Sequence, residues 1–224
     1  NIGPGSPTGT RFGYGAKFPA KYQDAFYVLD WSWGKIYAVH LEESGASYTA
    51  TKEEFITGAP LPVTDAIIHP NDGAMYFAIG GRRVQSGLYR VTYKGSANTE
   101  PVDMSPKVSA DQHLRHSLEA FHGKQDPKAI DAAWPYLNHN DRFISNAARV
   151  VLEHQHTDQW ATKALTDPYP GRRITALLAL ARVSGVSPSQ RPEKGHKIDT
   201  RTRDHILNSL LEVDFGSLTE RDQL

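Results

Sequence analysis

The chain has 224 residues and carries 25 Lys and Arg against 25 Asp and Glu, so its formal net charge at pH 7 is zero. That balance excludes a broad basic surface for nucleic acid and a polybasic membrane anchor, because both need clustered Lys and Arg. No cysteine is present, which excludes disulfides, thiolate metal sites and covalent haem attachment within these residues. No apolar run reaches the ~20 residues of a transmembrane helix. The N-terminus shows neither an initiator Met nor a signal-peptide pattern, so we expect a processed or excised piece of a longer protein.

The composition changes near Met104, which predicts two domains. Fifteen of the 22 aromatic residues and 13 of the 18 glycines precede that point, whereas eight of the ten histidines follow it. We predict β-propeller blades over residues 1–95, a linker over 96–108 and HEAT-like helical repeats over 109–224. The expected fold class is therefore α+β and multidomain.

The first half reads as short strands separated by turns. Stretches rich in aromatic and β-branched residues, with Gly, Pro, Asn or Ser between them, predict strands over residues 26–29, 35–41, 48–55, 65–68, 75–79 and 88–93. The pattern from Gly34 to Val39 recurs from Ser86 to Val91, an interval of about fifty residues that is typical of four-stranded propeller blades.

These strands make fewer than two blades, and a propeller needs about 4 to 8. An isolated pair of blades would leave strand edges and two apolar faces open. We therefore expect further blades before Asn1. Residues 3–15, which are rich in Gly and Pro, are then predicted to form a loop between blades.

The second half has helical periodicity with recognisable starts. Ser109 and Gln112 match a capping box, Asp126 with Pro127 is expected to begin the next helix, and Asp141 the one after. Further helices are predicted around Trp160 and Ala164, around Ile174 to Ala181, and over residues 203–213, after a polar loop at 184–197.

Two of these helices match at an offset of thirty residues, which predicts a short α-solenoid. The matched pairs are Arg142 with Arg172, Ile144 with Ile174, Ala147 with Leu177, and Ala148 with Leu178. We interpret the two arginines as a structural ladder that pairs with neighbouring Asp residues. The histidines at 113, 116 and 122 are interpreted as solvated rather than as metal ligands.

Candidates for substrate binding lie at the ends of the predicted strands, because propellers bind ligands at the central channel or on rim loops. They are Asp30, Trp31, Asp65 and Arg82. Asp65 either ligates calcium or a substrate hydroxyl, or it caps its own backbone. Trp31 either stacks on a sugar or quinone ring or packs between blades. Arg82 either contacts a bound anion or is a solvated loop charge. No catalytic residue and no metal ligand is assigned.

Several stretches of the chain resemble the closing blades and helical region of the planctomycete-type secreted dehydrogenase-like proteins, which belong with the glucose/sorbosone dehydrogenase-like β-propellers. The stretches in the first half are residues 15–23, 29–38, 62–65, 72–77 and 87–91, and those in the second half are 118–123 and 133–150.

The resemblance implies a C-terminal fragment of a periplasmic or extracellular enzyme that oxidises a sugar or alcohol and passes electrons to a c-type haem domain outside this chain. It also implies pyrroloquinoline quinone or haem c as cofactors of the full-length protein, with none assigned to this fragment. The expected partners are the preceding blades, the haem domain and a carbohydrate substrate, with no nucleic acid and no membrane span.

The alternative is a non-catalytic propeller and solenoid scaffold that binds glycan or protein. The quinone-binding cations of the family would fall near Ser32, Pro62 and Thr64, where this sequence has no basic residue. An anionic tricarboxylate needs such cations, which favours the scaffold, whereas the haem domain that the resemblance implies favours the enzyme.

Overall fold

The computed structural model describes residues 3, 5–81, 83–105, 107–185 and 199–223. The chain divides into two compact units. The first, Asn1–Ser44 with Tyr48–Lys107, is called the β unit here, and the second, Gly45–Ser47 with Val108–Leu224, the helical unit. The fold is mixed α/β.

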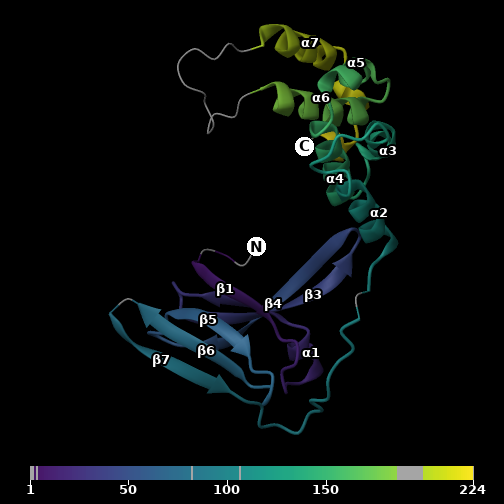
Figure 1. Cartoon of the computed structure of the whole chain (residues 1–224). Helices are drawn as coiled ribbons and strands as arrows, with labels where there is room; N and C mark the ends of the chain where they lie inside the picture. Colours follow the sequence, from purple (N-terminus) through teal and green to yellow (C-terminus); the bar gives the residue numbers. More distant parts are fainter. Residues whose placement is uncertain (1–2, 4, 82, 106, 186–198, 224) are drawn as a thin grey trace. The chain divides into compact units, whose positions relative to one another are not determined.

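The β unit contains two antiparallel sheets, and in each of them the strands follow one another in chain order (Figure 1). The four-stranded sheet is formed by β1 (Pro7–Phe12), β2 (Phe26–Asp30), β3 (Lys35–Ser44) and β4 (Ser47–Thr57), with the short helix α1 (Ala20–Gln23) before β2. The three-stranded sheet is formed by β5 (Val63–Ile68), β6 (Met75–Gly81) and β7 (Val84–Val91).

The six predicted strands are confirmed as β2 to β7, but the loop predicted over residues 3–15 is wrong, because it contains β1. Pro7 is tolerated there since it is the first residue of a strand at the sheet edge. Pairing with β2 outweighs the low strand propensity of this stretch. Phe12 lies opposite Phe26, and their ring centroids are 4.9 Å apart.

The two sheets share one core. Alternate residues of β2 and β3, among them Tyr27, Leu29, Ile36 and Ala38, are fully buried against the side chains of the second sheet. The second sheet contributes Val63, Ala66, Met75, Phe77 and Ile79 to this cluster.

The two sheets repeat one local geometry. Each has a register shift near the start of its first strand, between Pro7 and Gly9 in β1 and between Val63 and Asp65 in β5. The first strands of the two sheets, β1 and β5, lie side by side. The Thr8 hydroxyl in β1 donates to the carbonyl of Val63 in β5 at 2.8 Å. The third strands, β3 and β7, carry the recurring sequence pattern.

The turn between β2 and β3 requires glycine at position 34. Gly34 has φ +62°, and a Cβ there would lie 2.4 Å from the carbonyl oxygen of Gly58. The backbone can therefore approach this closely only without a side chain.

The helical unit consists of short helices in sequence (Figure 1). They are α2 (Ala110–Glu119), α3 (Ala129–Ala133), η1 (Trp134–Tyr136), α4 (Arg142–Glu153), η2 (Thr157–Gln159), α5 (Ala161–Thr166), α6 (Pro170–Ser184), α7 (Thr200–Leu211), η4 (Phe215–Ser217) and α8 (Glu220–Gln223). Most of the predicted loop at 184–197 lies outside the described residues.

Two of the three predicted helix starts are confirmed. Ser109 forms the complete capping box with Gln112, and Asp141 accepts from the first backbone N–H groups of α4. The start at Asp126 is wrong, since α3 begins at Ala129. The Asp126 carboxylate instead accepts the backbone N–H of Lys128 at 2.8 Å and closes a turn ahead of the helix.

The thirty-residue match between α4 and α6 holds at one buried pair and fails at the next. Ala147 and Leu177 are both buried, whereas Ala148 is fully buried and Leu178 is 51% exposed. The difference arises because α6 packs against α5 and α7 as well as α4, so its buried side is centred on residues 176–180.

Candidate functional site

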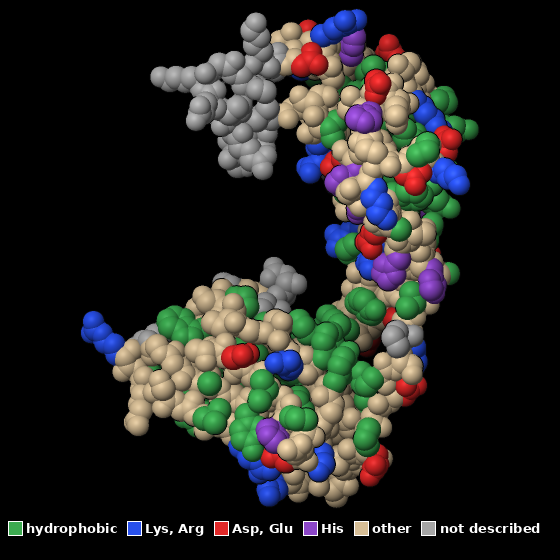
Figure 2. Space-filling model, viewed as in Figure 1, with side chains coloured by type: hydrophobic (Ala, Val, Ile, Leu, Met, Phe, Trp, Pro, Cys, Tyr) green, Lys and Arg blue, Asp and Glu red, His purple; other side chains and the backbone are tan. Residues whose placement is uncertain are grey.

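One face of the three-stranded sheet presents apolar side chains to solvent. By strand register, Asp65, Ala78 and Leu88 form one row across β5, β6 and β7, and Ile67, Tyr76 and Arg90 form a second row. We call these six residues the outer sheet face. Together with Ala66 and His69, most of them line a groove of about 480 Å³. Figure 2 shows hydrophobic side chains reaching the surface over the strands of the β unit.

The apolar side chains on the two outer strands of this face are open to solvent. Leu88 is 72% exposed and Ile67 is 43% exposed, although the next residues along the strands, such as Phe77, are buried in the core. Strand alternation explains this contrast, since neighbouring residues point to opposite faces.

One end of the groove is polar and tightly paired. The Asp72 carboxylate accepts the backbone N–H of Ala74 at 2.9 Å, the Tyr76 hydroxyl at 3.0 Å and the Arg90 guanidinium at 3.0 Å. His69 Nδ1 lies 3.5 Å from the same carboxylate. The Ala74 N–H, followed by Arg90 and Tyr76, lowers the pKa of Asp72 to about 2.

This shift predicts how acid affects the β unit. The pKa of Asp72 is lower in the folded protein than its ordinary value of 3.8, so its contribution to stability is present above that value and is lost as pH falls through about 2. We expect the stability difference between wild type and Asp72→Asn to shrink as pH is lowered from 4 towards 2. Urea midpoints of both proteins across this range test it, and a difference that does not change with pH would contradict it.

Asp65 is the one described sequence candidate that lines the groove. Its Oδ1 accepts the backbone N–H of Ala66 at 2.8 Å, and a Cβ at Gly9 would lie 3.3 Å from that oxygen. Asp65 therefore lies where β1 and β5 approach each other.

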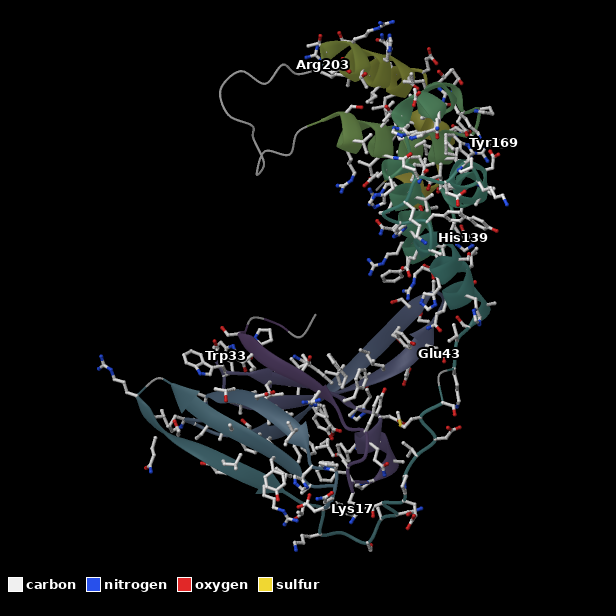
Figure 3. The ribbon with its side chains drawn as sticks, viewed as in Figure 1. Lys17, Trp33, Glu43, His139, Tyr169 and Arg203 are labelled. Atoms are coloured by element: carbon white, nitrogen blue, oxygen red, sulfur yellow. The ribbon has the colours of Figure 1, made fainter. Side chains whose placement is uncertain are left out.

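The other candidates lie elsewhere. Asp30 is 1% exposed, and its Oδ1 accepts the backbone N–H groups of Ser6, Ser32 and Trp33. The carboxylate thus holds the turn that follows β2. Trp33 in that turn is 59% exposed (Figure 3).

Trp31 is partly buried and lies against the end of β6. Its Nε1 donates to the carbonyl of Gly80 at 2.9 Å, and a Cβ at Gly81 would lie 3.2 Å from the indole ring. Arg82 lies outside the described residues.

A second surface cavity, of about 460 Å³, was not anticipated from the sequence. Glu53 Oε1 lies 2.8 Å from His40 Nε2 and 3.1 Å from Lys21 Nζ, and these contacts, His40 first, lower the pKa of Glu53. His40 and Glu53 belong to the neighbouring strands β3 and β4. Pairing these two predicted strands as a hairpin could have shown from the sequence that the two side chains lie close together. The Lys21–Glu53 pair is exposed and contributes little stability.

The polar centre of the helical unit is Asp167, which is 3% exposed. It accepts Trp134 Nε1 at 2.7 Å, the backbone N–H of Tyr169 at 2.8 Å and the Arg172 guanidinium at 2.7 and 3.1 Å. The predicted Asp partner is thereby confirmed for Arg172. The guanidinium of Arg142 lies over the ring of Phe143, 4.8 Å from its centroid.

The helical histidines are spread along the unit. His113 and His116 are exposed, as predicted, and His122 Nε2 lies 3.0 Å from the carbonyl of Ala147. Within the described ranges, no group of three or more His, Asp or Glu residues is arranged to hold a metal ion.

Among the helices that the structure describes, none combines the length and apolar character needed to cross a bilayer. Comparisons of this chain with family models, curated proteins and solved structures found no match.

Proposed function

We propose that this chain is a binding scaffold whose β unit supplies two neighbouring blades of a propeller-type assembly, with the outer sheet face receiving a further antiparallel sheet. One observation carries the proposal. Ile36 in β3 and Leu88 in β7 are equivalent in the recurring pattern, yet Ile36 is fully buried and Leu88 is 72% exposed.

The neighbouring strands, β2 and β6, are equivalent as well. In the first sheet, Leu29 and Tyr27 of β2 pair with Ile36 and Ala38 of β3. In the second sheet, Ala78 and Tyr76 of β6 pair with Leu88 and Arg90 at the equivalent positions of β7. In the first sheet this face is covered by the second sheet. In the second sheet the same face has the same register and remains uncovered among the described residues. A third sheet packed on it would continue the arrangement by one step.

The chemistry of the face fits such a sheet. Ile67, Ala78 and Leu88 are its apolar residues, and burying a large aliphatic side chain contributes about 1.5–3 kcal/mol. The charged residues on it are Asp65 and Arg90, and Arg90 is already paired with Asp72. A few paired charges among apolar residues are compatible with a protein interface.

The second candidate function is sugar or alcohol oxidation with electron transfer to a haem domain. It rests only on the resemblance to the glucose/sorbosone dehydrogenase-like propellers. The Asp30 carboxylate and the Trp31 indole each hydrogen-bond to backbone groups of the β unit. We therefore place the scaffold first.

Photo-crosslinking in the native, full-length gene product tests the scaffold. A crosslinking amino acid at position 88 is expected to label a peptide with alternating apolar residues, in the same polypeptide or a partner. The same amino acid at position 33, an exposed turn outside the outer sheet face, is the matched control.

Leu88→Asp should abolish assembly with the labelled sheet while leaving this chain folded. Labelling from position 33 but not from position 88, or labelling of helical peptides only, would contradict the proposal.

A further inference from the structure

The last long helix has a second apolar stripe. Helix α7 buries Ile206 and Ser209 against the rest of the helical unit, where the Ser209 hydroxyl donates to the carbonyl of Leu165 at 2.7 Å. Away from that side, Leu207 is 51% exposed, Leu210 38% and Leu211 83%. Their spacing of three and four residues places them on one helix face.

Charges flank this stripe in an order that does not favour the isolated helix. Arg201 and Arg203 lie in the first turn of α7, and Glu212 and Asp214 follow its last residue (Figure 3 labels Arg203). The helix dipole favours acidic groups at the N-terminus and basic groups at the C-terminus. Apart from the N-cap Asp199, the arrangement in α7 is the reverse, so the stability of the helix itself does not account for it.

These charges keep weak local partners. Arg203 pairs with Asp204, both 55% exposed, and Glu212 lies 3.5 Å from Arg173. The exposed Arg203–Asp204 pair contributes little and is readily exchanged, whereas the Arg173 side chain that meets Glu212 is only 16% exposed. Asp214 accepts the backbone N–H of Gly216 and is exposed.

We propose that α7 packs against α7 of a second copy of this chain, in antiparallel orientation about a two-fold axis. The pairing places Leu207 opposite Leu211 of the other copy, and Leu211 opposite its Leu207. It also places Arg203 near Asp214 of the other copy, twice in each dimer. One patch is thus complementary to itself, as a two-fold interface requires.

The interface is small. One exposed helix stripe buries less than the ~800 Å² per partner of a stable complex, so the dimer is expected to be weak and dependent on concentration. The charge pairs make association weaken as salt rises.

Sedimentation equilibrium of the full chain, at concentrations up to about 500 µM, tests the proposal. Wild type is expected to shift from monomer to dimer. Leu207→Asp combined with Leu211→Asp should weaken association by at least about tenfold. Leu41→Asp, at a 40% exposed position of β3 outside both proposed interfaces, is the matched control and should leave association unchanged. Loss of association in Leu88→Asp instead would assign the dimer to the outer sheet face and separate this proposal from the scaffold proposal.

A charge exchange tests the orientation. Arg203→Asp alone and Asp214→Arg alone should each weaken self-association, because like charges then face each other. Mixing the two variants should restore association, since both pairs across the interface are again opposite in charge. Circular dichroism checks that each variant keeps its helices.

Three outcomes would overturn the proposal. They are a wild-type chain that stays monomeric across the range, a dimer that the leucine pair does not affect, and a mixture that associates no better than the variants alone.

Discussion

Asp167→Ala is expected to lower the free energy of unfolding of the helical unit by about 3 kcal/mol. The carboxylate is 3% exposed and holds the Trp134 indole N–H, the Tyr169 backbone N–H and the Arg172 guanidinium. Truncation leaves a buried donor and a largely buried cation without their acceptor, and the penalty for unpaired buried groups exceeds the net contribution of the original bonds. Urea unfolding followed by the helical circular dichroism signal measures the loss.

Asp131→Ala is the matched control. Its carboxylate is 89% exposed and lies 3.7 Å from Lys163, so the expected change is within about 0.5 kcal/mol. Asp167→Asn should fall between the two, because the amide keeps one acceptor oxygen but no charge. Equal losses for Asp167→Ala and Asp131→Ala would show that Asp167 does not organise the helical unit.

Two helix starts could be predicted because the signal for each lies within a few residues of the helix. Ser109 and Asp141 could be identified as caps because a capping side chain bonds the backbone within three residues. β1 was missed because its partner, β2, begins more than a dozen residues later, and that pairing overrides the turn propensity of Pro7 and Gly9. Leu178 was misplaced for a similar reason, since the neighbours of α6 decide which of its sides is buried.

The candidate site was only partly predictable. Asp65 was singled out and lines the groove, whereas Asp30, chosen by the same rule, is committed to a turn. Both were predicted to lie at strand ends, although Asp65 is the third residue of β5. The sequence does not distinguish an acidic side chain that accepts from a turn from one that lines a surface groove. The exposure of Leu88 could not be predicted from the sequence either, because it depends on whether another layer covers the sheet.

Ile36→Ala and Leu88→Ala form a matched pair that measures this difference directly. The two side chains are equivalent in the recurring strand pattern and differ in burial, at 0% and 72% exposed. Ile36→Ala is expected to destabilise the β unit by about 3 kcal/mol, because it removes buried methyl groups and leaves a cavity between the sheets. Leu88→Ala should change stability by less than about 0.5 kcal/mol in the isolated chain.

Urea-dependent hydrogen exchange of peptides from β2 and β3 reports on this unit separately from the helices. In the assembled protein the two substitutions should lower stability by similar amounts, since a sheet packed on the outer sheet face would bury Leu88 as the second sheet buries Ile36. Leu88→Ala should then cost about 2 kcal/mol or more in the assembly. If it remained neutral there, the outer sheet face would be a solvent surface, and the equivalence of the two strands would be one of sequence pattern alone.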